Sequence, residues 1–303
     1  MDDDRPNLVE AVAVWGLFVL MVVAVVATYS RVAADELYHV SETGLSGGLG
    51  RALVSVNYPV ALVGAPLAVL AALRISERWA FWAAAVAAVL CWVVAIPGVV
   101  DQGDLDAKAV NAVPALGVIA ALALTIVAVS TKGLGSPERR LPGEGARLLV
   151  AAGLLLVGLP WFLADVGAYI GHVPLLGDVF MSNELAPTAE NPNHRVVHLG
   201  QHHGGHGVYL ALAALALTRV LPQIQGRVRA VLTFYFSLML VYGIAIVAED
   251  AWGEQVVARD WASWRVPNVL EPKASGGWVV VLVVAAAVHL FLLRPRAGRP
   301  RPS

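Results

Sequence analysis

Long uninterrupted apolar runs are the feature that most limits what this chain can fold into. Each run is roughly 17 to 25 residues long, the length that an α-helix needs to cross about 30 Å of hydrocarbon. Unpaired backbone groups cost several kcal/mol each in hydrocarbon, so every run must be helical there. We therefore predict an all-α integral membrane protein, a bundle of about eight transmembrane helices that forms a single transmembrane domain over 1–303, with no soluble domain. The predicted spans are about 9–30, 52–73, 79–100, 109–130, 148–171, 194–221, 230–249 and 277–293.

The composition argues against an ordinary soluble domain. Hydrophobic residues make up 58% of the chain and charged residues only 14%, whereas soluble domains are about a quarter charged. A large soluble core would also show shorter amphipathic segments with charges on their outer faces. Prolines are tolerated inside membrane spans, where they predict kinks or packed junctions. Five fall within the predicted spans: Pro59, Pro66, Pro97, Pro114 and Pro160.

The basic residues predict the orientation of the chain. Fourteen of the 21 lysines and arginines fall at the two ends and in alternate connections if there are eight spans. The positive-inside rule then places both termini in the cytoplasm. We expect the chain to lie in a plasma (inner) membrane. The basic residues on this side are Arg5, Arg74, Arg78, Lys132, Arg139, Arg140, Arg147, Arg219, Arg227, Arg229, Arg294, Arg296, Arg299 and Arg301.

The opposite, extracytoplasmic side is acidic and rich in histidine. It holds fifteen of the 22 acidic residues and seven of the eight histidines, all except His289. Polar residues inside a membrane are expensive to place there and are usually functional. We therefore expect the functional site of the protein to face the extracytoplasmic side.

A histidine-rich stretch from His194 to His206 carries the most unusual chemistry. Its histidines are His194, His198, His202, His203 and His206, and four of them are spaced four residues apart. Neighbours at that spacing lie nearly above one another on a helix and can chelate one ion. His194 and His206 would be about 18 Å apart along the axis, so the whole series cannot serve one ion. We expect one adjacent pair, or two pairs, completed by ligands from other helices.

Glycines accompany these histidines. Gly200, Gly204 and Gly207 form a stripe of small residues, which predicts close approach of another helix. The adjacent Gly204 and Gly205 cost roughly 1 kcal/mol each in a helix, so helical continuity at this point is open. With Pro192 near a helix start, the sixth span is expected to begin near residue 193.

Carboxylates and histidines elsewhere are candidates to complete the site. Glu36 and His39 have the Glu-x-x-His spacing used in di-iron bundles. Asp165 and His172 are seven residues apart at the outer end of the fifth span, and Glu249 ends the seventh span on the same side. We predict His39 and His172 as further metal ligands. Glu36, Asp165 and Glu249 are predicted as catalytic carboxylates, which would act as general acid or base.

Histidine and carboxylate ligands suit a divalent transition metal such as zinc, iron or copper. Histidines at two levels of a bundle could also hold haem. The leading interpretation is a metal-dependent membrane oxidoreductase or hydrolase that acts on a lipid or other hydrophobic small molecule. A divalent-metal transporter or sensor, or a haem- or copper-handling accessory subunit of a membrane complex, is the alternative. The expected partner is the lipid bilayer, with no nucleic acid; the oligomeric state is open.

Overall fold

The described part of the chain folds into helices. The computed structural model describes residues 5–31, 44–57, 60–101, 107–137, 141–165, 203–257, 259–270 and 272–293, and all regular structure in these ranges is helical. The helices are α1 (Val9–Tyr29), α2 (Gly44–Val56), α3 (Val60–Ile75), α4 (Arg78–Trp92), α5 (Ala112–Lys132), α6 (Glu144–Asp165), α8 (His203–Leu217), α9 (Gly226–Trp252) and α10 (Gly276–Val288). Short 3₁₀ turns (Val93–Ala95, Ala109–Asn111 and Thr218–Gln223) and π-helical turns (Gly253–Val257 and His289–Leu293) extend several of them.

The described helices make this a multi-pass α-helical membrane protein, as the apolar runs predicted. Six are long and apolar enough to cross a bilayer: Val9–Tyr29, Arg78–Ala95, Ala109–Lys132, Glu144–Leu163, His203–Gln223 and Gly226–Val257. Helices α2 and α3 together form a seventh candidate, bent by 63°. The segment Gly276–Phe291 is a shorter apolar helix. The apolar surface of such a helix is stable only where it faces lipid or packs on another helix.

The prolines inside the apolar runs differ in their effect. The run predicted over 52–73 is divided between α2 and α3, and Pro59 falls between these helices in the sequence. Proline lacks an N–H and disfavours a helical residue before it, which explains a break at this point. Pro66 and Pro160 lie inside α3 and α6, and Pro114 lies in the first turn of α5. Pro97 follows the 3₁₀ turn near the end of the third apolar run.

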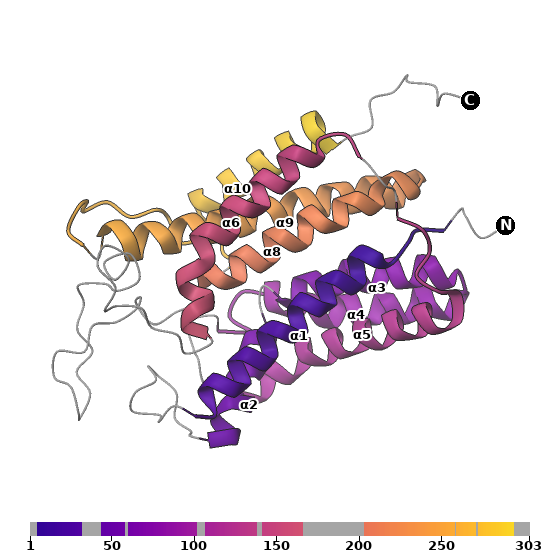
Figure 1. Ribbon diagram of the computed structural model, residues 1–303, viewed down its shortest axis with the longest axis horizontal. Coiled ribbons are helices and arrows are strands. Elements are labelled where there is room, and N and C mark those ends of the chain that lie inside the picture. Colours follow the sequence, from indigo (N-terminus) through magenta and orange to yellow (C-terminus); the bar gives the residue numbers. More distant parts are fainter. Residues whose placement is uncertain are drawn as a thin grey trace.

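The helices form two layers, shown in Figure 1. In one layer α3, α4 and α5 pack extensively on one another, and in the other α8 and α9 form the most extensive helix pair, flanked by α6 and α10. Helix α1 contacts α3 and α5 on one side and α6 and α8 on the other. Over an apolar stretch of 18 consecutive residues in each span, 72% of the residues are buried in the α8 span against 17% in the α6 span. The α6 surface therefore faces lipid, whereas α8 lies at the centre.

Polar side chains inside the bundle are paired across helices. The indole Nε1 of Trp15 on α1 donates a hydrogen bond of 3.0 Å to Oγ1 of Thr125 on α5. The Tyr235 hydroxyl of α9 donates to the Leu62 carbonyl of α3 at 2.7 Å. A polar group left unpaired in this environment would lose its hydration without compensation. These hydrogen bonds therefore fix how the two layers and α1 meet.

Replacing Thr125 with valine is expected to destabilise the bundle by about 1–2 kcal/mol, because it leaves the buried Trp15 N–H without its acceptor at nearly unchanged side-chain volume. Thermal unfolding of the purified protein in mild detergent measures the loss. Thr131→Val is the matched control, since Thr131 is exposed on the same helix and bonds only to the carbonyl of Val127. Equal stability of the two variants would contradict the assignment.

At one end of the bundle, here named the basic end, arginine side chains bind backbone carbonyls at helix ends and carboxylates of other helices. The Arg74 guanidinium donates to the carbonyls of Lys132 (2.7 Å) and Gly133 (3.1 Å), which are left unpaired where α5 ends. Nearby, a hydrogen bond from the Trp79 indole and the charge of Lys132 lower the pKa of the Glu77 carboxyl. Helix α1 begins and α10 ends at this same end (Figure 1).

A charge network at the basic end joins three helical segments. Arg219, in the turn after α8, pairs through Nε with Oε1 of Glu10 on α1 at 3.0 Å. Its Nη1 also pairs with Glu144 at the start of α6. The Glu10 side chain is only 8% exposed, so its charge depends on Arg219 for compensation. The network fixes α1 and α6 to the end of α8.

Candidate functional site

The end of the bundle opposite the basic end is named here the histidine end, and it is built around the start of α8. His203 and His206 lie in the first turn of α8, are half-buried, and have ring centroids 6.4 Å apart. They are spaced three residues apart, so both rings lie on nearly the same helix face. Helix α8 runs unbroken through Gly204 and Gly205. The helical continuity that the glycine pair left open is therefore present in this segment.

Asp250, near the end of α9, closes the start of α8. Its Oδ2 accepts a hydrogen bond from the backbone N–H of Gly204. The first N–H groups of a helix have no partner within the helix, and a carboxylate there also interacts favourably with the helix dipole. Asp250 therefore holds the two histidines in place through the backbone between them.

Glu254 and Trp161 form the wall of the histidine end beside α6. The Trp161 indole Nε1 donates to Oε2 of Glu254 at 2.7 Å, and both residues are buried. A Cβ at Gly204 would lie 2.4 Å from the Trp161 ring, so only glycine permits this packing. Glu254 lies in the π-helical turn that follows α9, a geometry often found at functional sites. The close approach predicted for the glycine stripe is confirmed at Gly204.

Gly207, the next glycine of the stripe, also allows another helix to approach closely. A Cβ at Gly207 would lie 2.7 Å from the Gly243 carbonyl, and one at Gly243 would lie 2.6 Å from the Gly207 carbonyl. Helices α8 and α9 therefore meet backbone to backbone at these two glycines. Gly200 lies outside the described residues. The contact sets the distance between the histidines on α8 and the carboxylates on α9.

Arg51 on α2 brings a buried positive charge to this end. The residue is 4% exposed, and its guanidinium carbon lies 5.4 Å from the centroid of the Tyr29 ring on α1. The histidine end thus contains a guanidinium, two imidazoles and carboxylates on different helices.

The predicted site residues fall into three groups. His203, His206 and Glu249 are described, and Glu249 is half-buried near the end of α9, next to Asp250 in the sequence. Asp165 is the last residue of α6, and its side chain is not described. The others lie outside the described residues: Glu36, His39, His172, His194, His198 and His202. Within the described ranges, no group of three or more His, Cys, Asp or Glu side chains is arranged to hold a metal ion. The metal site therefore stays a prediction.

Three residues of the histidine end were not singled out from the sequence: Arg51, Trp161 and Glu254. Glu254 lies four residues after Asp250, a spacing that places both carboxylates on one helix face and could have indicated a pair. Arg51 lies one residue before the predicted span over 52–73. Helix α2 begins earlier, at Gly44, and includes Arg51, so the burial of this side chain depends on where the helix begins. No sequence pattern indicated Trp161, because its partner Glu254 lies 93 positions away along the chain.

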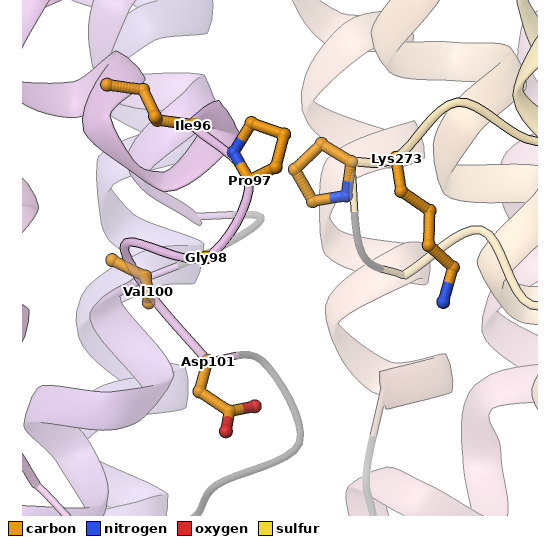
Figure 2. Close-up of a pocket in the computed structure, with 7 residues that line it drawn as sticks. Ile96, Pro97, Gly98, Val100, Asp101 and Lys273 are labelled. Carbon is orange, nitrogen blue, oxygen red and sulfur yellow. The ribbon is translucent and has the colours of Figure 1, made fainter.

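A cavity of about 290 Å³ lies beside the connection between α4 and α5. Figure 2 shows Ile96, Pro97 and Asp101 along one wall and Lys273 on the other. The remaining lining residues are Gly98, Val100 and Pro272. The lining holds one acid, one base and otherwise apolar groups, and it contains neither histidine nor a nucleophile. It is therefore not the centre of the predicted chemistry.

The loop after α9 folds back onto that helix. Trp252 and Trp264 stack with ring centroids 4.0 Å apart, and the Trp252 indole donates to the Trp264 carbonyl at 3.0 Å. Trp261 is 72% exposed. Exposed tryptophans at a span end are typical of the lipid–water interface.

Comparison of the chain with known protein families, with curated proteins and with solved structures finds no match.

Proposed function

We propose that the protein is a metal-dependent membrane enzyme, an oxidoreductase or a hydrolase, whose site lies at the histidine end and acts on a lipid or other hydrophobic molecule. The observation that carries the proposal is the pair His203 and His206, half-buried side by side at the start of α8, with the carboxylates of α9 beside it. Polar and ionisable groups gathered in a lipid-embedded bundle are expensive, which favours a functional role.

The spacing of the two imidazoles supports metal binding. Two imidazoles on one tetrahedral zinc ion, with zinc–nitrogen bonds of about 2.0–2.1 Å, have centroids roughly 5 Å apart. The observed 6.4 Å is slightly longer, so the rings need to approach one another only a little to share an ion. We propose that His198 and His202 complete the histidine set, with His39, His172 or His194 as further ligands.

The carboxylates supply the remaining chemistry in this proposal. Asp250 orients α8 through Gly204 and so acts as a positioning residue. Glu249, half-buried beside it in the sequence, is the proposed general acid or base, with Asp165 and Glu36 as further candidates. A bound zinc ion would make water more acidic for hydrolysis, whereas iron or copper would suit oxidation.

We also propose that the basic end faces the cytoplasm and that the histidine end faces the extracytoplasmic side of a plasma membrane, with about eight crossings. The observation in favour is that four arginines of the predicted cytoplasmic set have their partners at one end of the bundle. Arg5 and Arg74 donate to backbone carbonyls at helix ends, Arg147 donates to the Thr218 hydroxyl, and Arg219 pairs with the Glu10 carboxylate. Cytoplasmic connections are enriched in such residues.

The test is elemental analysis combined with an absorption spectrum of the full chain purified in mild detergent without chelators. We expect about one transition-metal ion per chain, and its loss in a His203→Ala/His206→Ala variant and in a His198→Ala/His202→Ala variant. His289→Ala is the matched control, because His289 packs against Phe234 on another helix pair. A Soret band would replace the enzyme proposal with the haem-handling alternative. Wild-type protein that stays metal-free after incubation with zinc, iron and copper would refute it.

A further inference from the structure

The cavity beside the α4–α5 connection lies between two walls that the core holds in place. On one wall, Val100 is buried in the main hydrophobic cluster. On the other wall, Leu270 of the same cluster precedes Pro272 and is fixed to α9, because the Tyr242 hydroxyl donates to its carbonyl at 3.0 Å. Pro97 and Pro272, whose rings restrict the backbone, both line the space. The cavity is therefore formed before any ligand enters it.

The two walls carry opposite charges. Asp101 lies on the α4 side and Lys273 on the α10 side, and Figure 2 shows their charged groups on either side of the space between the walls. Each side chain also interacts within the protein. Both are exposed, however, and a carboxylate or an ammonium takes part in several hydrogen bonds at once. Each can therefore bind a ligand in addition to its present partner.

A zwitterion suits this lining better than a simple ion. A cation drawn to Asp101 would be repelled by Lys273, and an anion drawn to Lys273 would be repelled by Asp101. A molecule with an ammonium and a phosphate on a short linker compensates both charges. The volume of about 290 Å³ is close to the lower limit of small-molecule pockets, roughly 300 Å³. The cavity therefore admits a headgroup but not the acyl chains of a lipid.

The position of the cavity favours a lipid as the source of that headgroup. Asp101 follows the candidate span Arg78–Ala95, and Lys273 precedes the apolar helix Gly276–Phe291. Lipid headgroups lie where spans leave the hydrocarbon. Ile96 of the lining and its neighbour Val99 are exposed. Acyl chains could therefore lie on apolar side chains while the headgroup occupies the cavity.

We propose that this cavity binds the headgroup of phosphatidylethanolamine, with the ammonium at Asp101 and the phosphate at Lys273. The cavity includes none of the proposed metal ligands, so this lipid site goes beyond the proposed function and does not depend on it. Free phosphoethanolamine in the aqueous phase carries the same two charged groups. The experiment therefore has to distinguish the lipid from the water-soluble molecule.

The experiment measures the thermal unfolding midpoint of the full chain in mild detergent against increasing ligand at constant ionic strength. The probes are short-chain phosphatidylethanolamine, phosphatidylcholine and phosphatidylglycerol, and free phosphoethanolamine. We expect saturable stabilisation, tightest for phosphatidylethanolamine, because the choline group has no N–H to donate and phosphatidylglycerol has no cation. Binding of phosphatidylethanolamine no tighter than that of the other two lipids overturns the proposal. Free phosphoethanolamine that binds as tightly as the lipid overturns the choice of a lipid.

Variants assign the two charges separately. Asp101→Asn is expected to raise the apparent Kd for phosphatidylethanolamine about 5- to 10-fold, the effect of one charge-assisted hydrogen bond at a partly exposed position, and to leave phosphatidylcholine binding nearly unchanged. Lys273→Gln should weaken both lipids by a similar factor, since both carry the phosphate. Asp260→Asn and Arg227→Gln are the matched controls, because these charged residues are exposed and lie outside the cavity. Loss of both lipids in Asp101→Asn, or unchanged binding in either cavity variant, overturns the assignment.

Discussion

Replacing Gly207 with valine is expected to lower the free energy of unfolding by about 3 kcal/mol or more, among the largest losses of any single change in the bundle. The new Cβ would lie 2.7 Å from the Gly243 carbonyl and 3.0 Å from the Ile246 Cβ, both much closer than van der Waals contact. Overpacking in a well-packed core typically costs 1–3 kcal/mol, and here the obstacle is helix backbone that cannot rotate away. Helices α8 and α9 would have to move apart along their whole contact.

The measurement is thermal or denaturant-induced unfolding in mild detergent, with metal content as a second readout. Gly243→Val should behave like Gly207→Val, because its Cβ would meet the Gly207 carbonyl at 2.6 Å. Gly153→Val is the control: Gly153 is exposed on α6, and a Cβ there meets nothing within 4 Å. If Gly153→Val were as unstable as Gly207→Val, the cost would come from replacing a helical glycine in general.

Replacing Arg219 with alanine is expected to destabilise the protein by about 3 kcal/mol, because the largely buried Glu10 carboxylate loses its compensating charge. Glu144 loses the same partner, but its side chain is 34% exposed and water can replace the interaction. Most of the loss should therefore arise at Glu10. Unfolding in mild detergent at neutral pH measures it.

A second substitution identifies the cause. Adding Glu10→Gln to Arg219→Ala removes the uncompensated charge and should restore more than half of the lost stability, a non-additive effect expected of contacting residues. Arg227→Ala serves as the control, since Arg227 is exposed at the start of α9. If the double variant were no more stable than Arg219→Ala, lost packing rather than charge would explain the effect.

The sequence predicted the class of the fold because membrane spans are a local property. Each apolar run satisfies its own backbone hydrogen bonds, so run length and composition suffice to indicate a helix. The position of the break between α2 and α3 was harder to predict. The Asn57 side chain donates to the Leu53 carbonyl at the end of α2, and Pro59 follows two residues later. Hydropathy alone does not distinguish such a break from a continuous span.

The candidate site was only partly predictable, because its contacts join distant positions. Periodicity identified His203 and His206 as candidates and Gly204 and Gly207 as a packing stripe. It could not show that Gly204 lies against Trp161 on α6, or that Gly207 meets Gly243 on α9. Those relationships depend on how whole helices pack, which is a tertiary property absent from any single run of sequence.

The central place of α8 has a consequence for how the nascent chain enters the membrane. Synthesis proceeds from the N-terminus, so α1 to α6 leave the ribosome before α8 exists. Helices α3, α4 and α5 can assemble at once, since they pack mainly on one another. Helix α6 packs mainly on α8, and until α8 arrives the polar anchor of α1 and α6 at Arg219 is also missing. During that interval an insertase or chaperone that shields Glu10 and Glu144 would protect the half-made protein from degradation.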